Sequence, residues 1–263
     1  MTTGSTTSDS KERFSNRVED YVRYRPGYPR AILGLLSEEC GLASESIVAD
    51  IGSGTGLLTQ LFLENGNLVY GVEPNAAMRQ AGEAFLKKYG HFRGVAGSAE
   101  VTTLPDACAD FIVAGQAFHW FEPKATRAEF ERVLKPRGWV AVIWNERKKD
   151  DTAFLREYET LLRAFGTDYE KVSEKYPQDR SMRSFFGSGA GGKKSFASEQ
   201  VFDFEGLRGR LLSSSYSPPQ GHPQHEPMLA ALDKLFKAHA EGGHVRFKYL
   251  THVYYGQLAG TSR

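Results

Sequence analysis

Two acidic residues and the three glycines between them are the best candidates in this chain for binding a ligand. Asp50 ends an apolar run, and Gly52, Gly54 and Gly56 follow at every second position. Glu73 ends a second β-rich run. Glycines let a backbone approach a ligand closely. A carboxylate before the loop would repel a phosphate but suit an ammonium group, and a carboxylate such as Glu73 can accept both hydroxyls of a ribose.

The glycine spacing separates this loop from two phosphate-binding motifs. A dinucleotide fingerprint, G-x-G-x-x-G, requires a third glycine where this chain has Leu57. A P-loop requires Gly-Lys-Ser/Thr, which does not follow. The glycines alone remain compatible with an ordinary turn between a strand and a helix.

Three further segments follow apolar runs and would lie at the same edge of a parallel sheet. Pro74 breaks the second run, and Asn75 can cap the helix predicted over 76–88. The segment 97–105 follows a run at 92–96, and the aromatic segment 116–121 follows a run at 109–114. Ligands of doubly wound sheets bind at the carboxyl ends of the strands, so these segments would surround the ligand.

These motifs resemble a known family. The pattern D-x-G-x-G-x-G is similar to motif I of the class I S-adenosylmethionine-dependent methyltransferases. The segment 71–78 is also similar to that family, and 116–121 resembles its small-molecule branch, methyltransferase type 11 or trans-aconitate methyltransferase-like. Nucleic-acid amino-methyltransferases carry Asn/Asp-Pro-Pro-Tyr/Phe after the fourth strand. Gln116-Ala-Phe-His stands there, which argues against methylation of bases.

The resemblance implies S-adenosylmethionine as the cofactor and assigns its contacts residue by residue. Asp50 and the backbone of Gly52, Gly54 and Gly56 would hold the methionine part. Glu73, followed by Pro74, would bind the ribose, Ser98 and Ala99 would flank the adenine, and Gln116 would lie beside the methyl group. The family often has Asp where this chain has Ser98, so the adenine contact here would depend more on the Ala99 amide.

The aromatic–arginine phrase at 21–28 is also shared with that branch, whose N-terminal segment closes over the cofactor. Arg25 could meet the methionine carboxylate as a two-pronged donor, and Tyr21 could cover the sulfonium. The alternative is that these are surface arginines packed beside structural tyrosines.

His119, Trp120 and Tyr216 are the candidates for the acceptor side. His119 could act as a general base, because its pKa suits neutral pH, or it could shape the pocket wall. Methyl transfer needs little acid–base help, and a carboxylate acceptor would need no base. Trp120 could equally belong to the core, and Tyr216 to an ordinary helix end.

The expected fold is α/β: a doubly wound, mostly parallel seven-stranded sheet with one antiparallel strand and a helical cap. Strands are predicted near 46–51, 68–73, 92–96, 109–114 and 139–144, with further runs at 199–204 and 247–258. Helices are predicted over 57–63, 76–88, 123–134 and 152–165. Residues 135–138 would form a turn, and 185–194, with four glycines, a mobile loop. We expect a flexible tail at 1–12 and one domain over 13–263, capped by 148–198 and 206–244.

Composition favours an intracellular enzyme. The net charge is +1, from 33 basic and 32 acidic residues, so nothing predicts binding to nucleic acid. The two cysteines have no metal-site or disulfide spacing, and no apolar run is long enough to span a membrane. We therefore expect a cytoplasmic protein with no metal, acting on a small-molecule substrate. The oligomeric state is not readable.

The sequence thus predicts methyl transfer from S-adenosylmethionine to a small molecule by in-line displacement. One alternative is a catalytically inactive S-adenosylmethionine-binding protein that acts as a sensor or partner subunit. A nucleotide-dependent oxidoreductase is the other, and the glycine spacing disfavours it.

Overall fold

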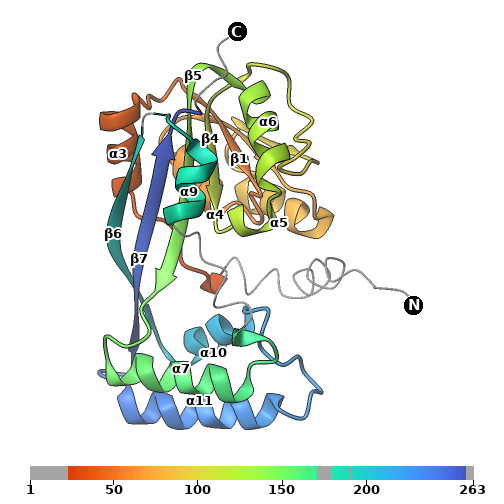
Figure 1. The fold of residues 1–263 in the computed structure, drawn as a ribbon. Helices are drawn as coiled ribbons and strands as arrows, with labels where there is room; N and C mark the ends of the chain where they lie inside the picture. Colours follow the sequence, from red (N-terminus) through yellow and green to blue (C-terminus); the bar gives the residue numbers. More distant parts are fainter. Residues whose placement is uncertain (1–22, 171–178, 190, 259–263) are drawn as a thin grey trace, which may run out of the picture. The chain divides into compact units, whose positions relative to one another are not determined.

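The computed structural model describes residues 23–170, 179–189 and 191–258 (Figure 1). The predicted tail at 1–12 and Tyr21 lie outside these ranges. The strands are β1 Ile47–Ile51, β2 Leu68–Val72, β3 Phe92–Val95, β4 Ala109–Gly115, β5 Leu134–Arg147, β6 Gly191–Phe202 and β7 Val245–Gly256. The helices are α3 Ala31–Cys40, α4 Leu57–Glu64, α5 Ala76–Leu86, the 3-10 turn η1 Phe118–Trp120, α6 Pro123–Val133, α7 Ala153–Phe165, α9 Asp179–Phe186, α10 Phe204–Leu212 and α11 His225–His239.

The seven strands form one sheet in the order β3-β2-β1-β4-β5-β7-β6. Strands β1 to β5 pair in parallel. Strand β7 runs against β5 (Figure 1): beyond the end of β5 the Lys148 amide donates to the Lys248 carbonyl, while Asn145 meets Thr251. The predicted fold class, a mostly parallel seven-stranded sheet with an antiparallel strand, is confirmed.

Alternation along the strands builds an apolar core on each face of the sheet. Successive side chains of a strand point to opposite faces. Val48 and Ile143 therefore pack with α3 and α4, while Ala49 and Val142 pack with α6 and α9. Helices on both faces make the sheet doubly wound.

The strand order fixes where a ligand site can form. The chain passes from β3 across the sheet to β4, so β1 and β4 are neighbours, and the helices that follow them, α4 and α6, pack on opposite faces. The loops 52–56 and 116–120 both begin at this switch point. They also touch each other, since a Cβ atom on Gly52 would lie 2.6 Å from the Cβ of Ala117.

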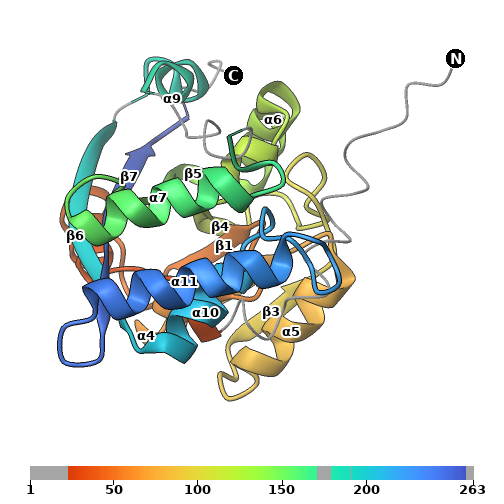
Figure 2. The ribbon, with the colours of Figure 1, turned by 90° about the horizontal axis from the view of Figure 1, so that it is seen from below.

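The chain divides into two compact units. Unit 2 comprises residues 27–145, 176–196 and 251–263. It contains β1 and β4 and therefore the switch point between them. Unit 1 comprises residues 1–26, 146–175 and 197–250. In unit 1, α7 and α11 lie side by side (Figure 2), over an apolar cluster that includes Leu155, Tyr158 and Phe247.

Two local predictions are wrong. The segment 185–194 is not a loop throughout, because α9 reaches Phe186 and β6 begins at Gly191. Its glycines permit close packing instead: a side chain at Gly191 would collide with the Tyr255 carbonyl of β7. The predicted turn at 135–138 is an irregularity inside β5, where pairing with β4 shifts between Ala109 and Phe111.

Candidate functional site

Asp50 lies beneath the glycine loop rather than on its surface. Its side chain has 0% exposure, and Oδ2 accepts a 2.6 Å hydrogen bond from the Thr59 hydroxyl of α4. Oδ1 is buried with no hydrogen-bond partner. Burial raises the pKa of Asp50 to about 7, with a further contribution from the charge of Glu73, against the lowering effect of Thr59. A cation near this buried oxygen would therefore stabilise the carboxylate.

The glycine loop directs four of its backbone amides into the protein rather than towards a ligand. The amides of Gly52 and Ser53 both donate to the Val72 carbonyl of β2, at 2.9 and 3.1 Å. The Gly56 amide donates to Ser53, and the Gly54 amide to Glu73. A phosphate cradle requires such amides to point at the ligand. Here these four are already bonded inside the protein.

All three glycines of the loop have positive φ: 70° at Gly52, 57° at Gly54 and 87° at Gly56. Residues with side chains rarely adopt this conformation, which explains the glycine at each position.

Glu73 ties the end of β2 to both neighbouring loops. Oε2 accepts from the Gly54 amide at 3.0 Å, and Oε1 accepts from the Asn75 amide at 2.8 Å. Arg79 donates to the Glu73 carbonyl. Each Glu73 oxygen therefore accepts a backbone amide, which fixes the carboxylate at the end of β2. Asn75 caps α5 as predicted, accepting from the Met78 amide at 3.1 Å, and Pro74 is exposed.

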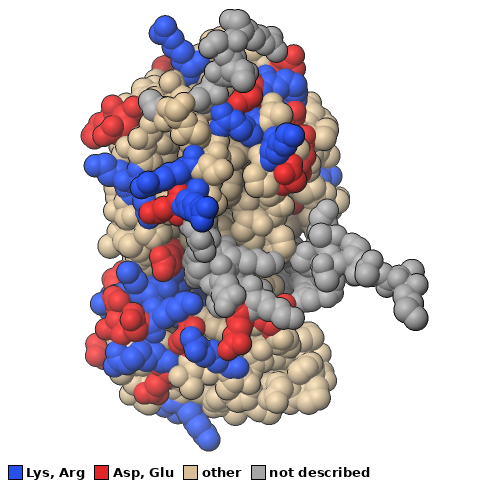
Figure 3. Space-filling view, viewed as in Figure 1, with Lys and Arg blue, Asp and Glu red and all other residues tan. Residues whose placement is uncertain are grey.

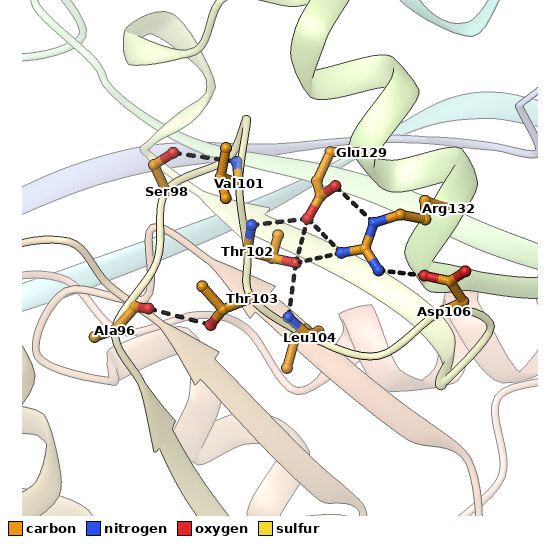
Figure 4. Close-up of polar contacts among 9 residues, drawn as sticks. All are labelled: Ala96, Ser98, Val101, Thr102, Thr103, Leu104, Asp106, Glu129 and Arg132. Carbon is orange, nitrogen blue, oxygen red and sulfur yellow. Dashed lines mark hydrogen bonds and ion pairs between the residues drawn. The ribbon is translucent and has the colours of Figure 1, made fainter.

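The predicted adenine loop is a tight turn (Figure 4). The Ser98 hydroxyl accepts from the Val101 amide at 3.3 Å, and the Ser98 amide donates to the Val101 carbonyl at 2.9 Å. Ala99 is buried against the core. The Ser98 side chain therefore already has a structural role, and its contact with a ligand stays a prediction, as does that of the Ala99 amide.

A charged cluster anchors the second half of this loop to α6. Glu129 accepts from both the amide and the hydroxyl of Thr102, at 2.8 and 2.6 Å. Arg132 donates to Glu129 and to Asp106, so its guanidinium bridges helix and loop (Figure 4). The hydrogen bond from Arg132 is the largest cause that lowers the pKa of Glu129, to about 2.

Gln116 holds the ends of β4 and β5 together. Its Oε1 accepts from the Asn145 amide at 2.8 Å, and its Nε2 donates to the Asn145 carbonyl at 3.2 Å. The Asn145 side chain in turn donates to Gly27 and accepts from Thr251. Gln116 has φ of 57°, a strained value for a residue other than glycine. Its contact with the cofactor stays a prediction.

The His119 ring, in the loop after β4, contacts two tryptophan rings, tilted against one and edge-on to the other. The ring centroids lie 4.5 Å from Trp120 and 5.1 Å from Trp144. Trp120 is 50% exposed, while Phe118 is buried against Phe185 of α9. The roles predicted for His119 and Trp120 stay predictions. The contacts of its ring with Trp120 and Trp144 show that His119 helps to shape this loop.

The remaining predicted residues belong to unit 1. Arg25 donates from Nη2 to the Ser213 carbonyl at 2.8 Å. The Tyr216 ring packs edge-on against Tyr169, with centroids 4.9 Å apart. The proposed contacts of Arg25 with cofactor and of Tyr216 with substrate stay predictions.

Three global features can be compared with the expectations from composition. No helix within residues 23–170, 179–189 and 191–258 combines the length and apolarity that a membrane crossing needs. In the same ranges no three His, Cys, Asp or Glu residues gather as a metal site would require. Lys and Arg intermingle with Asp and Glu on the face shown in Figure 3. The expected absence of nucleic-acid binding and of a metal, and the cytoplasmic location, stay predictions.

Sequence reasoning missed Thr59, Glu129 and Asn145. Thr59 is a fully buried polar residue on the otherwise apolar face of α4. Such a position is a signal that a polar partner lies opposite. Glu129 and Asn145 carry no comparable signal, because their partners are 27 and 29 residues away in the chain.

Comparison with known proteins identifies the family. A model described as a methyltransferase domain matches residues 49–142. An uncharacterised methyltransferase of Geobacillus kaustophilus is 30% identical over 199 residues, which cover 73% of this chain and 89% of the relative. One of Schizosaccharomyces pombe is 28% identical over 230 residues, covering 85% and 87%. The chain belongs to the class I S-adenosylmethionine-dependent methyltransferases.

Solved structures agree on the fold. A candidate type II methyltransferase from Anaeromyxobacter dehalogenans superposes with a TM-score of 0.65 at 20% identity, covering 89% of this chain and 98% of its own. A candidate S-adenosylmethionine-dependent methyltransferase from Methanococcus maripaludis gives 0.55 at 17% identity, covering 74% and 92%.

Proposed function

We propose that this chain transfers the methyl group of S-adenosylmethionine to a small-molecule acceptor by in-line displacement. One observation carries the proposal: two carboxylates, Asp50 and Glu73, lie at the ends of adjacent strands beside a glycine loop, four of whose amides are bonded inside the protein. This arrangement suits a cationic ligand with a ribose and disfavours a phosphate.

Asp50 would act through its charge. Because the side chain is fully buried, it does not form part of the loop surface. A ligand ammonium above the side-chain-free loop would lie within the field of the carboxylate and hold it deprotonated. Glu73 would accept the ribose hydroxyls while its bonds to Gly54 and Asn75 hold both loops in place.

Bound S-adenosylmethionine supplies a methyl group on a positively charged sulfur, which leaves with its electron pair as part of S-adenosylhomocysteine. The protein's part is then to align the acceptor and exclude water. The aromatic loop, with the exposed ring of Trp120, suits that part. This proposal does not require His119 as a base.

The test is an assay of S-adenosylhomocysteine release against a panel of metabolites that includes small carboxylic acids. We expect release to depend on one or a few acceptors and to be lost in Glu73→Ala. Binding of S-adenosylhomocysteine with no turnover on any acceptor would contradict transfer and favour a binding protein.

A further inference from the structure

Unit 1 buries two arginines inside its apolar cluster. Arg147, at the end of β5, is 8% exposed, and Arg210, on α10, is 6% exposed. Burying a guanidinium is expensive unless an anion compensates its charge. The two arginines differ in how this is achieved.

Arg147 is neutralised within the protein. Its Nη2 donates to Glu159 at 2.6 Å and to the Tyr169 hydroxyl at 3.0 Å, and Tyr169 donates to the same Glu159 oxygen at 2.7 Å. Burial raises the pKa of Glu159, but the bonds from Tyr169 and Arg147 outweigh it, so the pKa stays below its usual value. This triad is complete without a ligand.

Arg210 has no such anion. Its Nε donates to the Tyr249 hydroxyl at 3.3 Å and its Nη1 to the Ser214 hydroxyl at 3.1 Å. Both partners are neutral oxygens. No carboxylate of the described residues forms an ion pair with Arg210, and among them Nη2 has no hydrogen-bond partner.

Tyr158, in the same apolar cluster, is a second buried polar group to consider. The Tyr158 hydroxyl is buried without a partner in the described part of the chain, and the residue is 1% exposed. Its ring faces the Arg147 guanidinium at 5.2 Å. The Tyr158 ring also packs against Phe247 of β7 at 4.9 Å. Arg210 bonds to Tyr249, which follows Phe247 on the same face of that strand. Among the described residues, the buried Tyr158 hydroxyl therefore has no acceptor and the buried Arg210 guanidinium has no counter-anion.

The pKa of Tyr216 indicates that positive charge predominates around these side chains. Burial raises the pKa of its phenol, but the positive charges of Arg210, Arg147 and Arg25 outweigh burial and lower it. The surroundings of these side chains thus favour a negative charge.

We propose that Arg210 and Tyr158 form a binding site for the carboxylate of a small organic acid. A carboxylate supplies the negative charge that would balance the Arg210 guanidinium. It also offers two oxygens, one to accept from the guanidinium and one to accept from the Tyr158 hydroxyl. Both residues belong to unit 1. Occupancy of the site can be measured without a methyl donor, so this proposal and the proposed function can fail separately.

The experiment is calorimetric titration of the full chain with succinate, citrate and benzoate, and separately with inorganic phosphate. We expect at least one of the three acids to bind and Arg210→Met to weaken that binding tenfold or more. Tyr158→Phe removes one oxygen from a packed core and should weaken binding severalfold with the fold retained. Arg208→Met is the matched control, because Arg208 is an exposed arginine on the same helix.

Tyrosinate absorbance gives a second readout. A bound carboxylate should raise the pKa of Tyr216, so at a fixed alkaline pH the acid should reduce tyrosinate absorbance in the parent but not in Tyr216→Phe. Equal binding by the parent and Arg210→Met would overturn the proposal. So would binding of phosphate alone, or of none of the three acids.

Discussion

The Glu73 carboxylate accepts a hydrogen bond from the Gly54 amide at 3.0 Å, so the end of β2 holds the glycine loop that follows β1. In the proposed function, one side chain would therefore both position the loop and supply the acceptors for a ribose. Asp50, beneath the same loop, adds a buried charge. In the proposed function, ribose binding and the geometry of the glycine loop are therefore coupled through Glu73.

Replacing Glu73 should weaken cofactor binding. Glu73→Ala removes the ribose acceptors and frees the Gly54 amide, so S-adenosylhomocysteine affinity should fall by about 1–3 kcal/mol, the usual size for hydrogen bonds to a charged group. Calorimetry measures the change, and Glu83→Ala, at an exposed position on α5, is the control. An affinity equal to that of the parent would remove Glu73 from the site.

Asp50 should make stability depend on pH. Its folded pKa of about 7 exceeds the unfolded value of about 3.9. Between these values the folded chain holds a proton that the unfolded chain has lost, so this stabilisation is complete below pH ~4 and is lost as pH rises through ~7. Asp50→Asn should lack this decline.

The full pKa shift of Asp50 corresponds to ~4 kcal/mol of unfolding free energy. At pH ~8, Asp50→Asn should therefore be more stable than the parent, by roughly 1–3 kcal/mol. It should also bind S-adenosylhomocysteine less tightly, because the charge is gone. Urea unfolding at several pH values and calorimetry check both effects. A variant less stable than the parent at pH ~8, with unchanged affinity, would refute the role given to this charge.

Gly52 should not tolerate a side chain. Gly52→Ala combines a positive φ with a 2.6 Å approach to the Ala117 Cβ, and should destabilise the fold by about 1–3 kcal/mol. Adding Ala117→Gly should recover part of this loss but not the part caused by the backbone. Gly90→Ala, where nothing lies within 4 Å, is the control. Equal stability of Gly52→Ala and Gly90→Ala would argue against the tight contact of the two loops.

Glu129 should stabilise the fold mainly above its folded pKa. That pKa, about 2, lies below the unfolded value of about 4.3, so the stabilisation is present above pH ~4.5 and lost as pH falls towards ~2. Glu129→Gln should be less stable than the parent at pH 7, and the gap should narrow from pH 5 to 3. Urea unfolding measures it, with Glu131→Gln as a more exposed control on α6. A gap that does not change with pH would contradict the ion pair.

Local patterns predicted most of the sheet and the loops at its switch point. Asp50, the three glycines and Glu73 are consecutive features of one strand–loop–helix–strand unit, so spacing alone placed them together. The glycines at 191 and 192 misled, because a glycine that admits a neighbouring strand has the same letter as one in a mobile loop.

The polar partners could not be predicted in the same way. Arg210 looks like one more helical arginine, and only the packing of α10 against the cluster of unit 1 buries it. The burial of Asp50 likewise depends on α4, whose Thr59 bonds it from nine residues away. Spacing in the sequence predicts which strand or helix carries such a residue, but not whether the residue is exposed to solvent.

The central claim is that the glycine loop with Asp50 and Glu73 binds S-adenosylmethionine and not a phosphate-containing dinucleotide. Parallel calorimetric titrations with S-adenosylhomocysteine and NAD test it most directly. We predict saturable binding of S-adenosylhomocysteine that Glu73→Ala weakens, and no binding of NAD. Binding of NAD without S-adenosylhomocysteine would contradict the account.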